Sequence, residues 1–146
     1  MSSIPSPKLS AIEQYLFVDN RPSYPLDFFY RLKFAGSLDE SRLLDAYRKA
    51  LEQHPLLRAI VVARRMGYRW KLCGDPPKFE VLHNAAADAE LSPEAIDLTV
   101  EPGCRLYVCA GPQQTTLQFQ FHHSATDGLG AMGFVEDVMA LSLIHI

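Results

Sequence analysis

The sequence predicts an α/β fold of two layers, a mixed β-sheet with helices on one face, in a single domain. Two stretches, 28–35 and 115–122, alternate apolar with other residues at the period of a β-strand. A third stretch, 38–53, carries apolar residues at helical spacing and is the clearest helix of the chain. Strands and helices that follow one another in this way are typical of a sheet covered by helices.

A short helix is expected near the N-terminus, over 9–17. Ser10 can cap its start, and Glu13 follows three residues later, which is the spacing of a capping box. The strand over 28–35 comes next. Its aromatic and aliphatic residues alternate with a mixed set, so one face of this strand is apolar and the other is mixed.

The helix over 38–53 has charged residues on the side opposite its leucines, and Ser37 or Asp39 can cap its start. His54 and Pro55 end it, because the residue before a proline disfavours helical backbone. A histidine near a helix C-terminus is more often a satisfied capping group than a catalyst, and we interpret His54 in this way.

Turn residues divide the rest of the chain into short apolar runs. Two pairs of these runs are expected to form hairpins, one around Met66 and Gly67 and one around 111–114. A final helix is expected over 129–140. The remaining strands of the expected sheet are 59–63, 68–72, 79–82 and 105–110.

Composition is that of an ordinary globular protein, with 146 residues, 48% hydrophobic and 21% charged. The net charge of -3 gives no reason to expect a nucleic-acid partner. No apolar run is long enough for a transmembrane segment and no secretory signal is visible, so a cytoplasmic location is expected. Cys73, Cys104 and Cys109 show no metal spacing and are interpreted as buried reduced thiols.

The candidate functional residues stand at 122–128, where the strand 115–122 ends. A histidine at a strand end, on a loop between a strand and a helix, is well placed for proton transfer. If the alternation of the strand continues, His123 shares the apolar face and His122 points the other way. We therefore expect His123 to be the partly desolvated ring, able to act as a general base if a second group fixes its tautomer.

Asp127 and Gly128 end the turn. Asp127 can cap the following helix, and Gly128 allows a positive φ and a close passage of the chain. Two other interpretations stay open. The histidines can simply cap a strand, or they can bind a metal. The metal is the weaker of the two, because His122, His123 and Asp127 supply at most three ligands and no further His or Cys stands at a ligand spacing.

Residues 122–128 read HHSATDG, which fits the pattern HHxxxDG. This resembles the signature of the condensation-type acyltransferases. They include nonribosomal peptide condensation domains, wax ester synthases, polyketide-associated acyltransferases and alcohol acetyltransferases, and they share a fold with chloramphenicol acetyltransferase. The segments 54–58, HPLLR, and 96–106 are similar to further family segments. In the second, proline and glycine are swapped and Cys104 replaces an apolar residue.

The resemblance implies one lobe of a chloramphenicol acetyltransferase-like fold, with 1–140 as the N-terminal lobe of a longer, two-lobed protein. It implies acyl transfer from a thioester, on coenzyme A or a carrier protein, to a hydroxyl or amine. His123 would be the catalytic base, and His122, Asp127 and Gly128 would shape the site, with Asp127 paired to an arginine. No metal or tightly bound cofactor is implied, and the residues that bind the donor and stabilise the oxyanion stay unidentified.

Two alternatives belong to other classes. One is a non-catalytic lobe that binds an acyl chain or a carrier protein; the intact His123 and Asp127 argue against it. The other is an inactive fragment. Residues 141–146 can be encoded by CTGTCTCTTATACACATC, which resembles a transposase adapter of sequencing libraries, so we expect a foreign tail there. Without a second lobe, Phe134, Val135 and Val138 are expected to lose their cover.

Overall fold

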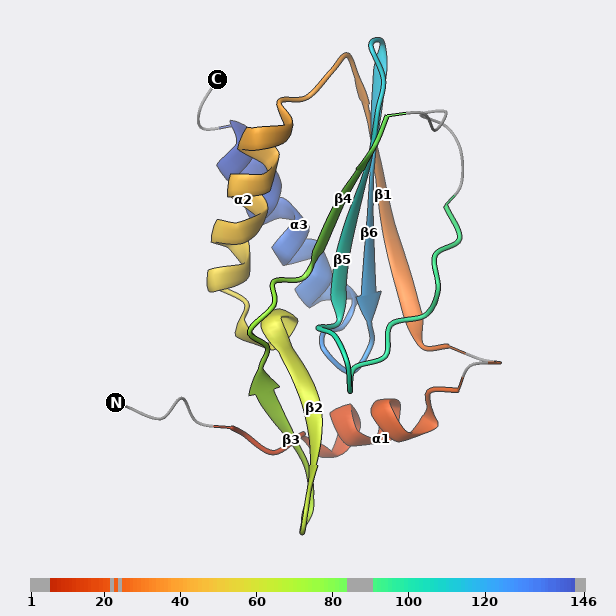
Figure 1. Ribbon diagram of the computed structural model, residues 1–146, viewed down its shortest axis with the longest axis vertical. Helices are drawn as coiled ribbons and strands as arrows, with labels where there is room; N and C mark the ends of the chain where they lie inside the picture. Colours follow the sequence, from red (N-terminus) through yellow and green to blue (C-terminus); the bar gives the residue numbers. More distant parts are fainter. Residues whose placement is uncertain (1–5, 22, 24, 84–90, 144–146) are drawn as a thin grey trace.

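The computed structural model describes residues 6–21, 23, 25–83 and 91–143. Figure 1 shows its helices and strands. Their bounds are α1 (Ala11–Asp19), β1 (Asp27–Ala35), α2 (Glu40–Glu52), the 3-10 helix η1 (Pro55–Arg58), β2 (Ala59–Arg64), β3 (Gly67–Leu72), β4 (Lys78–Leu82), β5 (Cys104–Ala110), β6 (Gln114–His122) and α3 (Gly128–Leu143).

A mixed four-stranded sheet, in the order β1-β6-β5-β4, forms one layer of the fold. β6 pairs antiparallel with β1 and β5, and β4 pairs parallel with β5. α2 and α3 lie together on one face of this sheet (Figure 1). The predicted two-layer α/β arrangement, with a mixed sheet and helices on one face, is therefore confirmed.

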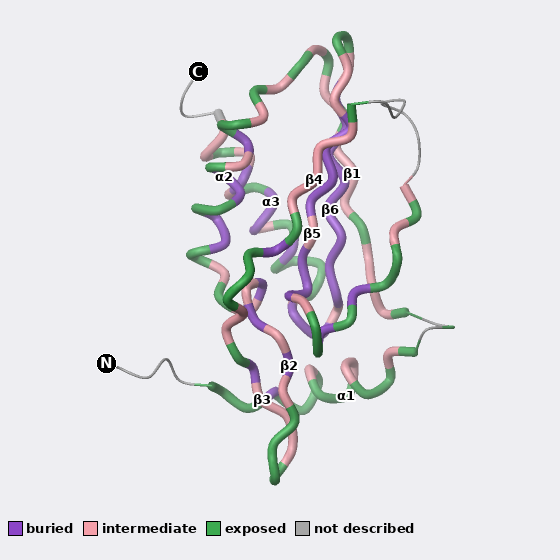
Figure 2. Tube along the Cα trace, viewed as in Figure 1, coloured by how far each residue is buried: buried purple, intermediate pink, exposed green. Residues whose placement is uncertain are grey.

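The other face of the sheet is covered by the chain that leads from 91 to 103 (Figure 1). Glutamines of β6 hold this segment. Gln118 Nε2 donates to the Leu91 carbonyl and Gln120 Nε2 to the Glu94 carbonyl, both at 3.0 Å. β6 is consequently buried on both faces, polar residues included (Figure 2).

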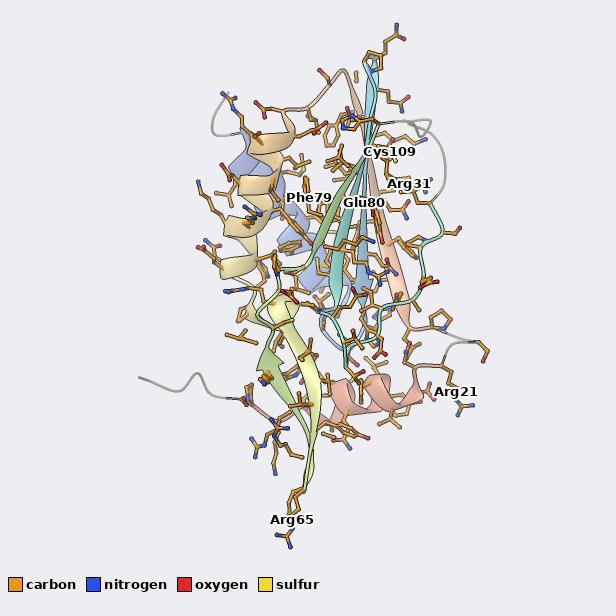
Figure 3. All side chains as sticks on the ribbon, viewed as in Figure 1. Arg21, Arg31, Arg65, Phe79, Glu80 and Cys109 are labelled. Carbon is orange, nitrogen blue, oxygen red and sulfur yellow. The ribbon has the colours of Figure 1, made fainter. Side chains whose placement is uncertain are left out.

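The prediction that all the strands share one sheet is wrong. β2 and β3 form a separate two-stranded hairpin, which extends past the sheet with Arg65 at its tip (Figures 1 and 3). Pro76 and Pro77, between β3 and β4, have no N–H to continue a ladder. Alternation in the sequence identifies which residues form a strand. Which strand pairs with which depends on contacts between residues far apart in the chain, and the alternation does not show these.

α1 begins at Ala11, two residues later than predicted, and its capping box is confirmed. Ser10 Oγ accepts the Glu13 N–H at 3.2 Å, and Glu13 Oε1 accepts the Ser10 N–H at 2.7 Å. No residue of α1 is buried, and Ile12, Tyr15 and Val18 are 60–64% exposed on it (Figure 2). Polar bonds therefore hold this helix together with one partly buried aromatic residue, Phe17, whose ring lies 5.0 Å from the Tyr68 ring of β3.

α2 starts after Asp39, whose Oδ1 accepts the Arg42 N–H at 3.2 Å. His54 follows its end but its ring caps no main-chain group, so this part of the prediction is wrong. Instead, His54 Nε2 lies 2.8 Å from Asp137 Oδ2 and joins the end of α2 to α3. The buried side of α2 consists of Leu43, Ala46, Tyr47, Ala50 and Leu51.

α3 extends past the predicted 129–140 and ends at Leu143, inside the segment interpreted as foreign; 144–146 lie outside the described residues. Phe134 and Val138 are 0% exposed and Val135 is 7% exposed, so the prediction that they lose their cover is wrong. They pack within this lobe, where the Phe134 ring contacts Tyr47, Phe119 and Phe121. Among the described helices, none combines the length and the apolar character that crossing a membrane requires.

Candidate functional site

The segment 122–128 connects β6, a central strand, to α3. A tight turn follows the strand, because the N–H groups of Ala125 and Thr126 both donate to the His122 carbonyl, at 3.0 and 3.3 Å. The structure thus places the two histidines at the end of the strand and Asp127 and Gly128 at the start of α3. Side chains on this turn are supported by a strand on one side and a helix on the other.

His122 is the more buried of the two histidines, with 1% of its surface exposed. His123 is partly desolvated, as predicted, but the expectation that it is the more desolvated of the two rings is wrong, because the 91–103 segment lies against His122. Burial lowers the pKa of His122 to about 4, and the neighbouring charge of His123 acts in the same direction. His122 Nδ1 accepts the Ser124 N–H at 3.0 Å, so the ring is neutral and carries its proton on Nε2.

His123 is half-buried and is the more accessible of the two histidines. Its main-chain N–H donates to the Leu26 carbonyl at 3.0 Å. Its ring lies 4.3 Å from the Phe28 ring, centroid to centroid. Within the described part of the chain its ring nitrogens make no hydrogen bond, so the group expected to fix its tautomer is not found there. A ring with free nitrogens can take a proton from a bound molecule.

Asp27, at the start of β1, is a carboxylate near His123 that the sequence did not single out. Its Oδ2 accepts the Ile96 N–H at 2.8 Å and the Gln120 amide at 2.7 Å. Its Oδ1 is buried and has no hydrogen-bond partner among the described residues. Burial raises the pKa of Asp27, and those hydrogen bonds and the charges of Arg105 and His123 act in the opposite direction. The sequence feature that could have identified Asp27 is an acidic residue at the start of an apolar strand.

Asp127 caps α3, as predicted. Its Oδ1 accepts the Gly130 N–H at 2.7 Å, and its carbonyl accepts the Ala131 N–H at 2.9 Å. The arginine partner that the resemblance implied is not found among the described residues. Asp127 is exposed.

Gly128 does not adopt the positive φ that the sequence suggested; it is the first residue of α3. Its carbonyl accepts the Tyr30 hydroxyl at 2.8 Å, which ties α3 to β1. The tight approach is made by Gly103 instead. A Cβ on Gly103 would lie 2.8 Å from the Ala125 Cβ and 3.2 Å from the His122 Cβ. The glycine beside Pro102 therefore lets this segment pass directly against the motif.

The buried cysteines of the described chain are poor nucleophiles. Burial raises the pKa of the Cys104 thiol to about 12, so this cysteine is no nucleophile. Cys109 is buried as well, and burial raises its pKa too. Across the described residues, no three side chains of His, Cys, Asp or Glu gather as a metal site requires.

No family model matches the chain, and no curated protein matches it. Solved structures match nearly all of it. The starter condensation domain of rhizomide synthetase RzmA is 16% identical, with a TM-score of 0.78 over 95% of this chain and 38% of that chain. The tallysomycin biosynthesis protein TlmII is 16% identical, with a TM-score of 0.75 over 94% and 37%. A chain in the complex of the X-domain and OxyB from teicoplanin biosynthesis is 18% identical, with a TM-score of 0.73 over 97% of this chain and 33% of that chain.

At these identities the likeness shows the fold. The chain has the chloramphenicol acetyltransferase-like fold of a condensation-domain lobe and resembles condensation domains over nearly all of its length. It spans 33–38% of the length of the three proteins just named. Two further structures of the RzmA domain contain C8-CoA, one of them together with Leu-SNAC.

Proposed function

We propose that residues 1–140 form the N-terminal lobe of an acyltransferase, in which His123 is the general base. The observation that carries this proposal is that the two histidines differ in burial and in hydrogen bonding. His122 is buried and neutral and its Nδ1 is already bonded to the turn, whereas His123 is half-buried and its ring nitrogens are free of the described residues. A base must be reachable by the proton it abstracts.

The reaction follows from what this imidazole can do. One ring nitrogen of His123 takes the proton of an acceptor hydroxyl or amine as that group attacks the thioester carbonyl. The C–O or C–N bond forms, the carbonyl becomes tetrahedral, and the C–S bond then breaks. The thiolate leaves with the proton that His123 held, so the base is restored and no net charge accumulates. Burial of the neighbouring His122 as a neutral ring keeps a second positive charge away from the imidazolium.

The donor class is a thioester, on coenzyme A or a carrier protein. The support is the fold shared with RzmA, structures of which contain C8-CoA. We further propose that the groups that bind the donor and stabilise the oxyanion lie on a second lobe; the support is that the chain spans 38% of the RzmA domain. Residues 141–146 are proposed to be a foreign tail and are given no functional role.

A lobe that binds a protein partner without catalysis is the second candidate. It is favoured by one observation, the match to a structure in which an X-domain is in complex with OxyB. Thioester turnover by the complete protein that contains these residues distinguishes the two. C8-CoA and a panel of hydroxyl and amine acceptors are the substrates, and free thiol is measured.

Loss of the base is expected to lower kcat by roughly a hundred- to ten-thousand-fold in His123→Ala. His122→Asn is the matched control, because its amide oxygen can still accept the Ser124 N–H. It is expected to retain most of the activity. Absence of turnover in the wild type, with retained binding of a carrier protein, would support the binding lobe. Equal losses in the two variants would remove the assignment of His123.

A further inference from the structure

Ser124 connects the motif to α1. Its side chain is 2% exposed, and its Oγ donates to the main-chain carbonyl of Glu13 at 2.8 Å. The two residues stand 111 positions apart in the sequence. This hydrogen bond is separate from the one that the Ser124 N–H donates to His122, so Ser124 is anchored by its main chain to β6 and by its side chain to α1.

Glu13 is a fixed point for this anchor. Its Oε1 accepts the Ser10 N–H at 2.7 Å and the Trp70 Nε1–H at 3.1 Å. Trp70 lies on β3 and is 2% exposed, so the first turn of α1 is bound to the hairpin. No residue of α1 is fully buried, so its place against the hairpin depends on the bond from Trp70 to Glu13 and on the contact of the Phe17 ring with Tyr68. Figure 1 shows α1 beside the hairpin, below the end of the sheet.

His123 stands between two anchors. On one side its N–H donates to the Leu26 carbonyl, next to β1; on the other side the following residue, Ser124, is bonded to α1. The ring itself contacts Phe28 and has no hydrogen bond to the described residues. The position of the imidazole therefore depends on where its main chain is held. A displacement of about 1 Å at a reacting group can cost on the order of a hundredfold in rate.

We propose that Ser124 is a positioning residue for the reaction. Its hydroxyl, bonded to the Glu13 carbonyl, holds the His123 imidazole at the point where it meets the acceptor. Ser124 is buried and acts through its neighbour, without contact to the reacting atoms. The inference rests on the proposed role of His123 as the base, and it assigns to α1 the task of holding the catalytic turn.

The matched control is Ser10→Ala. Ser10 Oγ accepts the Glu13 N–H in the same turn of α1, and none of its hydrogen bonds reaches the motif. Ser124→Ala and Ser10→Ala each remove one hydroxyl hydrogen bond from Glu13. They differ in whether the lost bond holds the His123 turn. A third variant, Ser124→Cys, keeps the size of the side chain but offers only a weak donor, and it carries the test where Ser124→Ala does not fold.

The experiment measures kcat and KM for thioester turnover by the complete protein, in the wild type and in the Ser124, Ser10 and His123→Ala variants. We expect Ser124→Ala to lower kcat by about 10- to 100-fold, with the KM for the donor little changed, because misplacement of the base acts on the transition state. Ser124→Cys should lose kcat in the same direction, and Ser10→Ala should keep the kcat of the wild type.

A wild-type kcat in Ser124→Ala while His123→Ala is inactive would overturn this inference and leave the proposed function intact. An equal loss in Ser10→Ala would overturn it too, since the effect would then belong to the stability of α1. A wild-type kcat in His123→Ala would overturn the proposed function and, with it, the role of Ser124.

Discussion

The main-chain N–H of Ser124 donates to Nδ1 of His122 at 3.0 Å, inside a turn where His122 is 1% exposed. A protonated imidazole has N–H groups on both nitrogens and cannot accept this bond. Protonation of His122 therefore opposes the fold twice, by placing a charge in a buried position and by breaking the turn that carries His123. Burial and hydrogen bonding both favour the neutral ring at this position.

Stability of the chain is expected to fall in mild acid because of His122. Its pKa is about 4 in the fold, against 6.5 for an ordinary histidine. Between these two values the unfolded chain binds more protons than the folded chain, so stability decreases as the pH falls through this window and the loss is complete below it. The contribution of this one group is about 3 kcal/mol at most.

Urea denaturation at pH values above and below this window measures the effect. His122→Asn is the control, because the asparagine does not titrate and can keep the bond to Ser124. A pH dependence that is just as steep in His122→Asn would show that other groups, such as Asp27, cause it.

Gly103→Ala is expected to lower both stability and activity. The new Cβ would lie 2.8 Å from the Ala125 Cβ, so the motif turn must move, at a cost of about 1–3 kcal/mol. Gly133→Ala is the matched control, since a Cβ there meets nothing within 4 Å inside α3. That variant should be neutral or more stable by about 0.5–1 kcal/mol. Thermal melts of both variants check this, and equal melting temperatures would contradict the contact seen at Gly103.

Asp127→Ala is expected to lose about 0.5–2 kcal/mol of stability, because the Gly130 N–H loses its acceptor at the start of α3. Asp127→Asn should melt like the wild type, since an amide oxygen caps a helix equally well. Comparison of the two variants separates the effect of losing the helix cap from the effect of losing the negative charge. Lost turnover in Asp127→Asn at an unchanged melting temperature would show that the carboxylate itself is needed, as a partner for an arginine outside the described residues.

Residues 1–146 on their own are expected to show no thioester turnover. The proposed reaction needs donors for the oxyanion and walls that exclude water as well as the proposed base, His123. Next to the motif, Leu129 is 81% exposed and Met132 is 46% exposed, and α1 exposes a further apolar side, so association is expected as well. Light scattering and a thioester assay of the isolated chain test both points. A monodisperse monomer with turnover above its His123→Ala variant would show a self-sufficient enzyme.

Several features of this protein follow from its sequence alone. The alternation in 115–122, the helical spacing in 38–53 and the pair Ser10 and Glu13 each act over a few residues, and the structure contains the strand, the helix and the capping box that they predict. Asp127 is another local feature, because an N-cap needs only the next turn of helix. Local geometry is sufficient for such elements.

Only the tertiary structure decided which histidine is buried. Alternation separates His122 from His123, but the degree of burial depends on what covers each face, and the 91–103 segment covers the side that the pattern treated as open. The bond from Ser124 to Glu13, the pair of His54 with Asp137 and the separate β2–β3 hairpin are of the same kind. Each joins residues far apart in the chain, and a pattern of neighbouring residues carries no information about a partner that distant.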